Sequence, residues 1–146
     1  MPNNIVTSNR EEALQMNTDT IDSNAHVFIN FSNHPSELWS NEQKNSAKQL
    51  FGGQIMDIPF PRVSASANET ELKDLALRCV EKLCSYQPAA VMCQGEFGLT
   101  YQIVTLLKKR GIRTVYSCSE RKTVERKTDN GTVKTSEFCF VRFRDY

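Results

Sequence analysis

Short apolar runs alternate with amphipathic stretches along this chain, and this alternation limits its fold more than any other feature. The runs have the length and the continuous apolarity of buried strands, and they cover residues 26–31, 55–59, 89–93 and 112–117. Strands that are separated by helices predict a parallel sheet with right-handed crossovers. We therefore expect an α/β fold, a small Rossmann-like domain with a central, mostly parallel sheet flanked by helices.

Helical spacing appears in the stretches between the strands. Residues 40–51 begin with a capping serine, Ser40, and the inward face of this helix should include Leu50. The clearest helix follows Asn68, which has a glutamate three residues later as in a capping box, and it ends before Pro88. Each of these stretches predicts an amphipathic helix with one buried stripe.

The two ends of the chain differ from this pattern. A third predicted helix follows the loop after residue 93, has Leu99, Ile103, Leu106 and Leu107 on one face, and closes at Gly111. The chain then finishes with a predicted β-hairpin, residues 121–127 and 132–144, centred on Asn130-Gly131. Residues 1–24 are polar and have no sustained period, so we expect a flexible N-terminal extension. Residues 25–146 would then form a single domain.

Composition excludes several classes of protein. With 39% hydrophobic and 24% charged residues the chain resembles an ordinary soluble domain, and no apolar run approaches the roughly 20 residues of a membrane span. No secretory signal is visible, so we expect a cytoplasmic protein. Residues 101–146 carry eleven Lys and Arg against five Asp and Glu. This basic segment either steers an anionic ligand or forms a solvated face.

Three polar loops follow predicted parallel strands: residues 32–34, 94–100 and 117–122. In open α/β sheets, ligands bind outside the carboxyl ends of the strands, where helix N-termini present unpaired N–H groups. Because the carboxyl ends of parallel strands meet at one edge, the three loops predict a single composite pocket.

The second loop, Gln94 to Thr100, has the pattern of an anion-binding turn. Gly95 and Gly98 would let the backbone approach a phosphate, the helix dipole would favour its charge, and Thr100 would add a hydroxyl. The fingerprints for dinucleotides and for ATP are both absent, so no cofactor is expected. In the alternative interpretation, the glycines serve only a tight turn.

Four side chains in these loops are candidates for chemistry. His34 would act as an acid or base or donate to a phosphate, unless it is a surface histidine without a role. Glu96 would orient a hydroxyl or accept a proton, or it merely caps the helix. Arg121 and Lys122 would stabilise charge on a phosphorane, or they are surface charges of the hairpin.

Aromatic residues near the C-terminus suit stacked bases. Every second residue is aromatic or basic here, which places four side chains on one face of the predicted strand: Phe138, Phe140, Arg142 and Arg144. A half-buried strand or a dimer face would give the same pattern. Phe97 is likewise either a stacking surface or a core residue.

From residue 26 to 146 the order of features resembles a small family of type III CRISPR accessory proteins with a CARF-like Rossmann core. The resemblance rests on residues 28–34, 94–101 and 138–146, of which the middle stretch is the most specific. It implies a ring nuclease, which binds and cleaves a cyclic oligoadenylate second messenger, most often cyclic tetra-adenylate, and switches off the antiviral response.

Residues and resemblance together give a set of expected site residues. The expected catalytic residues are His34, Glu96 and Arg121. The expected substrate-binding residues are Ser32, Asn33, Gln94, Gly95, Phe97, Gly98, Thr100, Ser119 and Lys122.

The implied reaction needs no metal, because a ribose 2′-hydroxyl attacks the adjacent phosphate and leaves a 2′,3′-cyclic phosphate. The sequence agrees, since it has no acidic or histidine cluster with metal-ligand spacing, and its five cysteines contain no C-x-x-C pair. The symmetry of a cyclic tetranucleotide suggests a twofold homodimer, without a membrane or DNA partner. Two alternatives remain: a protein that sequesters or senses the ring without cutting it, and a weaker one, an RNA-binding subunit that lacks a dense Lys/Arg run.

Overall fold

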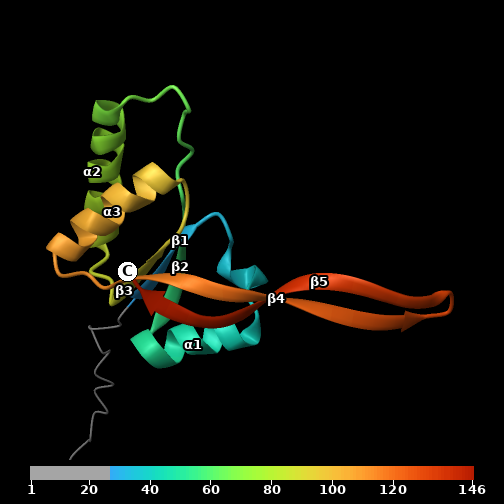
Figure 1. Ribbon diagram of the computed structural model, residues 1–146. Coiled ribbons are helices and arrows are strands. Elements are labelled where there is room, and N and C mark those ends of the chain that lie inside the picture. The colour runs from blue at the N-terminus through green and yellow to red at the C-terminus, as the bar shows by residue number, and fades with distance from the viewer. Residues whose placement is uncertain (1–26) are drawn as a thin grey trace, which may run out of the picture.

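The computed structural model describes residues 27–146, and the expected N-terminal extension at residues 1–24 lies outside them. Figure 1 shows one sheet with helices on both sides and a long hairpin that projects from it. The elements in chain order are β1 (Val27–Ser32), η1 (Ser36–Leu38), α1 (Asn41–Phe51), β2 (Gln54–Pro59), α2 (Glu69–Ser85), β3 (Ala90–Cys93), α3 (Phe97–Lys109), β4 (Thr114–Thr128) and β5 (Gly131–Asp145).

The five strands form one sheet in the order β2-β1-β3-β4-β5. β1 to β4 pair in parallel, and β5 pairs with β4 in the antiparallel direction. The predicted fold class, a mostly parallel α/β sheet that ends in a hairpin, is therefore confirmed. None of the helices among residues 27–146 has the length and apolarity needed to cross a bilayer.

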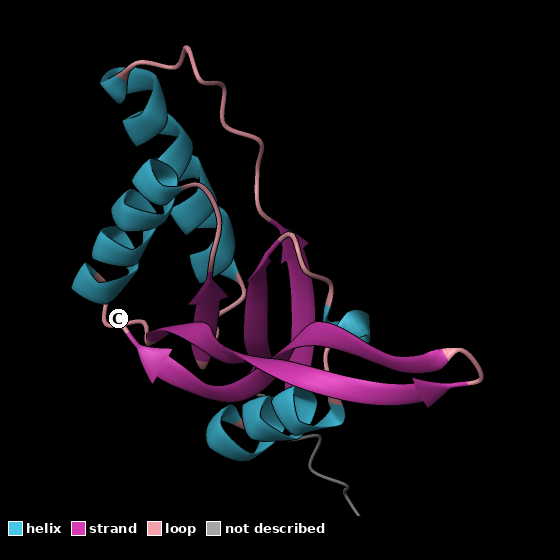
Figure 2. Ribbon diagram, turned by 45° about the vertical axis from the view of Figure 1, so that its right-hand side comes forward, coloured by secondary structure: helices cyan, strands magenta, loops and turns pink. Residues whose placement is uncertain are grey.

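Two hydrophobic clusters divide the helices between the faces of the sheet (Figure 2). One cluster packs β1 and β3 against α2 and α3, through residues such as Ile29 and Ile103. The other packs Phe28 against α1 and Trp39, and Phe28 stacks on Phe51 with ring centroids 4.9 Å apart. The sheet is thus covered on both faces, as parallel sheets usually are.

Local signals set the ends of the helices as predicted. The Ser40 side chain accepts a hydrogen bond from the Gln43 backbone N–H at the start of α1. Asn68 and Glu71 form a complete capping box at the start of α2. The prediction was wrong for Leu50, which is 55% exposed, because α1 turns only its Ala47 and Phe51 side inward.

β4 and β5 differ from the expected hairpin in length. Each strand has 15 residues, and β4 runs without a break through the segment between residues 117 and 121 where the sequence predicted a boundary. The pairing of Thr128 with Gly131 puts the two-residue turn at Asp129 and Asn130, one residue before the predicted centre. The antiparallel pairing with β5 carries β4 beyond its parallel contact with β3, which ends at Val115.

Candidate functional site

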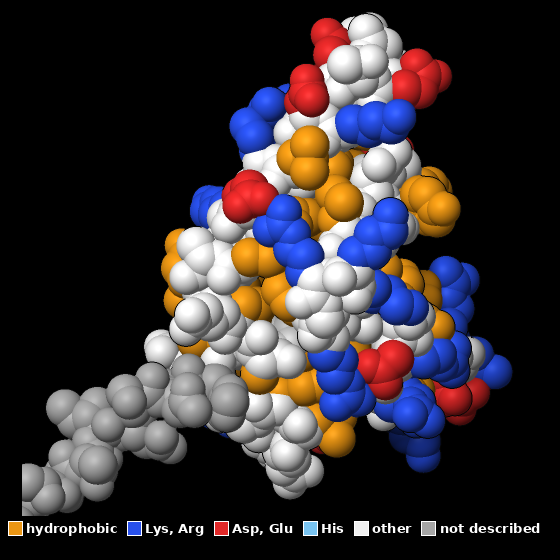
Figure 3. Space-filling view, turned by 90° about the vertical axis from the view of Figure 1, so that its left-hand side faces the viewer, with side chains coloured by type: hydrophobic (Ala, Val, Ile, Leu, Met, Phe, Trp, Pro, Cys, Tyr) orange, Lys and Arg blue, Asp and Glu red, His pale blue; other side chains and the backbone are white. Residues whose placement is uncertain are grey.

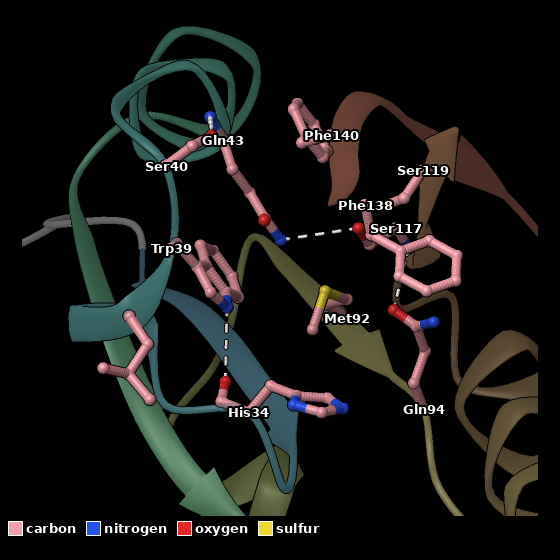
Figure 4. A pocket seen from close by; sticks show the side chains of 11 residues that line it. His34, Trp39, Ser40, Gln43, Met92, Gln94, Ser117, Ser119, Phe138 and Phe140 are labelled. Atoms are coloured by element: carbon pink, nitrogen blue, oxygen red, sulfur yellow. Dashed lines mark hydrogen bonds between the residues drawn. The ribbon is translucent and has the colours of Figure 1, made fainter. Parts of the chain in front are cut away.

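A cavity of about 600 Å³ opens at the carboxyl edge of the sheet, between α1 and the base of the hairpin (Figure 4). Each of the three predicted loops contributes to it, through His34, Gln94 and Ser119. The full lining consists of His34, Leu38, Trp39, Ser40, Gln43, Met92, Gln94, Ser117, Ser119, Phe138 and Phe140.

The topology of the sheet explains why the cavity lies here. β1 is flanked by β2 and β3, so the chain leaves β1 towards one side through α1 and leaves β3 towards the other through α3. Helices on opposite faces diverge at such a switch point and leave a crevice outside the strand ends, where ligands of open α/β sheets bind. His34 follows β1 and Gln94 follows β3, so the cavity occupies the switch point.

A hydrogen-bond network below His34 fixes the first loop. The His34 backbone oxygen accepts from Asn30 Nδ2 at 2.8 Å and from Trp39 Nε1 at 3.2 Å. Ser32 Oγ donates to Asn30 Oδ1 at 2.7 Å, and Asp57 Oδ1 accepts from Asn30 Nδ2 at 2.8 Å. Asn30 and Ser32 are both buried, so this network sets the path of the loop instead of presenting groups to a ligand.

The predicted residues of the first loop therefore have different positions. His34 directs its imidazole ring towards the cavity in Figure 4. Ser32 is 5% exposed and serves the network, while Asn33 is exposed but does not line the cavity. His34 is the residue of this loop that a bound ligand would meet.

Gln94 is held by the neighbouring strand. Its Oε1 accepts a hydrogen bond from the Ser117 backbone N–H at 2.9 Å. On the other side, Gln43 Nε2 lies 3.5 Å from Ser117 Oγ, within hydrogen-bonding distance. Ser117 thus joins two carboxamide side chains from α1 and from the end of β3 (Figure 4).

The N-terminus of α3 differs from the anion-binding turn that the sequence suggested. Glu96 is the N-cap of α3, and its carboxylate accepts from the Gly98 N–H at 3.0 Å and the Leu99 N–H at 2.7 Å. These hydrogen bonds hold the pKa of Glu96 below its ordinary value. The protein's own carboxylate occupies the amides that a phosphate was expected to use, so capping is the role of Glu96 that the geometry supports.

Packing explains the two glycines of this loop. A Cβ atom on Gly95 would meet ring atoms of Phe60, and a Cβ atom on Gly98 would come within 3.2 Å of Leu72 Cδ2 on α2. Neither glycine lines the cavity. The alternative interpretation, in which these glycines serve the turn and its packing, fits this arrangement better than close approach to a phosphate.

Two further predicted ligands of the second loop also lie outside the cavity lining. Phe97 is 92% exposed. Thr100 Oγ1 is buried and has no hydrogen-bond partner among the described residues. Of the predicted residues from 94 to 100, only Gln94 lines the cavity.

The hairpin supplies one wall of the cavity and one cation beside it. Phe138 lines the cavity, and the Arg121 guanidinium carbon lies 5.0 Å from the centre of the Phe138 ring. Arg121 and Phe138 are also directly opposite one another on β4 and β5. Lys122 pairs with Glu137, and adjacent strand residues point to opposite faces, so Lys122 faces away from Phe138.

Other cations of the basic C-terminal segment lie away from the cavity. Figure 3 shows Lys and Arg side chains spread over the side of the molecule on which α2 and α3 lie, with Asp and Glu side chains among them. On this side, Arg110 and Arg113 of the segment have acidic partners: Arg110 contacts Glu81, and Arg113 Nε lies 2.7 Å from Asp145 Oδ1. Neither arginine lines the cavity. This part of the segment is therefore a solvated face, as the second interpretation of the charge pattern predicted.

A change of register in the hairpin separates aromatic from basic side chains. Cys118 pairs with Arg142 but Ser119 pairs with Phe140, which leaves Val141 as an extra residue on β5. Phe140 consequently packs on Phe143, with ring centroids 5.0 Å apart. The prediction that Arg142 and Arg144 share the face of Phe138 and Phe140 was wrong, because simple alternation does not continue through a bulge.

Tyr146 anchors the return strand next to the cavity. Its hydroxyl donates to the Cys93 backbone oxygen at 2.6 Å, directly before Gln94 in the chain. Burial raises the pKa of Tyr146 to about 12, so the phenol keeps its proton at neutral pH. The contact couples the end of β5 to the end of β3.

The sequence analysis missed several lining residues, chiefly Trp39, Gln43 and Met92. Trp39 is the only tryptophan of the chain and directly precedes the capping Ser40, so it follows the loop after β1. That position is a usable signal, because a helix start after a parallel strand lies at the carboxyl edge. Met92 had no such signal, since it is buried in β3 like its neighbours.

Comparison with known proteins finds a family model that covers nearly all of the described residues. Residues 26–144 match the model of the uncharacterized protein MJ1673 family. No match was found among curated proteins or among solved structures.

Proposed function

The chain belongs to the uncharacterized protein MJ1673 family, and we propose that it is a ring nuclease, which binds a cyclic oligoadenylate and cleaves it without a metal. Cyclic tetra-adenylate is the expected ring. The observation that carries the proposal is the cavity at the switch point of the sheet, which brings His34 together with aromatic, amide and hydroxyl side chains. Cleavage would remove the second messenger and so end type III CRISPR signalling in the cytoplasm.

Aromatic groups of the cavity suit the bases of the ring. Phe138 is 71% exposed although it lines the cavity, and Trp39 and Phe140 contribute further aromatic surface. Aromatic side chains bind single-stranded nucleotides by stacking, which is worth about 1–3 kcal/mol per base. An exposed phenylalanine in the cavity wall is well suited to this task.

Positive charge for the phosphates comes from the hairpin. Arg121 shares the face of Phe138 and lies over its ring, so a base on Phe138 would bring its phosphate near the guanidinium group. Arginine binds phosphate through paired N–H donors. The same charge would stabilise the transition state of phosphoryl transfer.

The proposed reaction is an internal transesterification. The 2′-oxygen of one ribose forms a bond to the adjacent phosphorus, the bond from phosphorus to the 5′-oxygen breaks, and the products are a 2′,3′-cyclic phosphate and a 5′-hydroxyl. One proton leaves the 2′-oxygen and one joins the 5′-oxygen, so no water is consumed. Among the residues that line the cavity, His34 is the one with an imidazole, a group that can accept and donate a proton in general acid–base catalysis, and it would assist one of these transfers.

We further propose that two copies bind one ring. Phe97 and Tyr101 lie one turn apart on α3, and they are 92% and 72% exposed. α3 begins at the carboxyl edge of the sheet, so two copies that pair through these rings would present two cavities to a twofold-symmetric ligand. Light scattering should give the mass of a dimer, and the mass of a single chain at micromolar concentration would contradict this part.

Binding without cleavage is the second candidate. Since Glu96 caps α3, the cavity lining has no carboxylate to complete an acid–base pair with His34. A protein that sequesters the ring needs only the residues that bind it. Incubation of the purified protein with cyclic tetra-adenylate in EDTA, followed by chromatography, separates the two: new linear products support the nuclease, and tightly bound but intact ligand supports sequestration.

A further inference from the structure

We infer that the open edge of β4 in the hairpin docks on the same edge of a second copy of this chain. The two strands run antiparallel and are related by a twofold axis at Thr123. This surface, residues 119–127, differs from the contact proposed through Phe97 and Tyr101, and the inference does not depend on the ligand of the cavity.

One edge of β4 lacks a neighbouring strand over most of its length. β3 pairs with β4 only at Thr114 and Val115, whereas β5 follows the other edge as far as Thr128. Figure 1 shows the hairpin extending away from the rest of the sheet. From residue 119 to residue 128 every side chain is exposed except Val124, which is half-buried. A two-stranded ribbon is marginally stable alone, and a long open edge is a template for a further strand.

Hydrogen bonds at the start of β4 show which backbone groups point to this edge. On the β3 side, the Val91 N–H donates to the Arg113 oxygen, and the Ser117 N–H donates to Gln94 Oε1. The groups of a strand alternate between its two edges, and the extra residue of the bulge, Val141, lies on β5. The odd-numbered residues of β4 therefore point to the open edge. No strand among residues 27–146 pairs with this edge at positions 119, 121, 123, 125 and 127.

Charge restricts the position of a twofold axis on this edge. In a symmetric antiparallel pair, the residue on the axis faces its own copy, and like charges directly opposite one another are destabilising. Five of the seven residues from 120 to 126 are charged, namely Glu120, Arg121, Lys122, Glu125 and Arg126. An axis within this stretch is therefore restricted to Thr123 or Val124.

An axis at Thr123 brings opposite charges together. Arg121 then faces the partner's Glu125, and Glu120 faces the partner's Arg126. The twofold axis repeats both pairs, so four opposite-charge pairs flank the centre. At the centre, Thr123 faces the partner's Thr123, which is also a favourable cross-strand pair.

An axis at Val124 brings like charges together. It would place Arg121 opposite the partner's Lys127, and Lys122 opposite the partner's Arg126. Symmetry repeats these pairs as well, and each of them is destabilising. Thr123 is thus the position that the charge pattern favours.

The pairing would end beside the cavity. With the axis at Thr123, the partner's Lys127 faces Ser119, which lines the cavity. Pairing does not extend further, because the Ser117 N–H is already bound by Gln94. The partner therefore brings a cation next to a cavity whose lining contains no lysine or arginine.

A cysteine on the axis tests the contact. One pair of strands is a small interface, so we expect association above micromolar concentrations, and a cross-link traps even a weak contact. Residues that exchange backbone hydrogen bonds across an antiparallel pair have Cα atoms about 5.5 Å apart, which suits a disulfide. Under oxidation with diamide, which takes up the two electrons and two protons of the thiols, Thr123→Cys should form a covalent dimer. Thr132→Cys, at an exposed position of β5, and the wild type with its five free cysteines are the controls.

Charge reversal tests the position of the axis. Association is measured by sedimentation velocity in Phe97→Ser/Tyr101→Ser protein, which lacks the contact proposed through α3. Glu120→Arg and Arg126→Glu should each weaken association about tenfold, and the double reversal should restore it. Asp74→Arg, at an exposed position of α2, should have no effect. Melting temperatures check that every variant folds.

Each measurement has an outcome that overturns the inference. If Thr123→Cys forms no more covalent dimer than Thr132→Cys, the β4 edges do not meet. If the double reversal associates as weakly as the single variants, the axis does not lie at Thr123. Neither measurement contains a nucleotide, so a failure here leaves the proposed function to its own test.

Discussion

The Glu96 carboxylate accepts a hydrogen bond from the Leu99 backbone N–H at 2.7 Å, across the first turn of α3. The same carboxylate accepts from Gly98 N–H at 3.0 Å. A helix N-terminus binds anions through these unpaired amides and the helix dipole, and here an anion of the chain itself is bound. These two amides are therefore not free to bind a phosphate.

Glu96→Gln should lower the melting temperature at neutral pH and leave cleavage intact. The pKa of Glu96 lies below its ordinary value of 4.5 in the folded protein, so the ionised cap stabilises the fold above that value. This contribution is lost as the pH falls through the lowered pKa. The difference in melting temperature between wild type and variant should thus shrink below about pH 4.5, as thermal melts across pH would measure.

Glu96→Asp provides the control for this prediction. Aspartate is a favoured N-cap, so this variant should melt closer to the wild type than Glu96→Gln does. A Glu96→Gln protein with an unchanged melting temperature and a large loss of cleavage would show instead that Glu96 acts in the chemistry.

Gly95→Ala should destabilise the fold through Phe60. The added Cβ atom would overlap the Phe60 ring, and overpacking of this kind typically costs about 1–3 kcal/mol. In the Phe60→Leu protein the ring is gone, so Gly95→Ala should lower the free energy of unfolding less there than it does in the wild type. Chemical denaturation of the four proteins gives this coupling, and additive effects would show that the contact with Phe60 does not explain the glycine.

The sequence predicted those parts of the fold that local patterns determine. Apolar runs marked the strands, and caps such as Ser40 and Asn68 marked the starts of helices, because these signals act within a few residues. The alternation of strands and helices also indicated the parallel sheet and the edge at which His34 and Gln94 meet.

Other features depend on contacts that no local pattern contains. Position 95 has no room for a Cβ atom because of the Phe60 ring, which lies 35 positions earlier in the chain. The faces of the hairpin depend on a bulge at Val141, beyond which alternation gives the wrong side for Arg142. The chemistry of the adjacent Arg121 and Lys122 likewise could not show which of them shares the strand face of Phe138.

Arg121→Ala and Lys122→Ala should differ although they remove the same charge. Arg121 shares the face of Phe138 at the cavity, whereas Lys122 lies on the opposite face of β4. Arg121→Ala should weaken binding of cyclic tetra-adenylate by about 1.5–3 kcal/mol, the usual contribution of a hydrogen bond to a charged group. Lys122→Ala should have little effect in the same titration, and equal losses would indicate only long-range charge.

His34→Ala should slow cleavage more than it weakens binding. General acid–base catalysis by a positioned side chain contributes about 10²- to 10⁴-fold to the rate, and a loss of this size is expected in single-turnover cleavage. The dissociation constant of the ring should change far less, because the aromatic and amide groups of the cavity remain. Equal losses in rate and affinity would make His34 a binding residue.

Single-turnover cleavage of cyclic tetra-adenylate in EDTA, compared with a ring that is methylated at every 2′-oxygen, tests the central claim most directly. The account predicts that the unmodified ring is opened to products with a 2′,3′-cyclic phosphate, while the methylated ring binds and stays intact. Cleavage of both rings would contradict attack by the 2′-hydroxyl, and failure of the unmodified ring to bind would contradict the assignment of the cavity to a cyclic oligoadenylate.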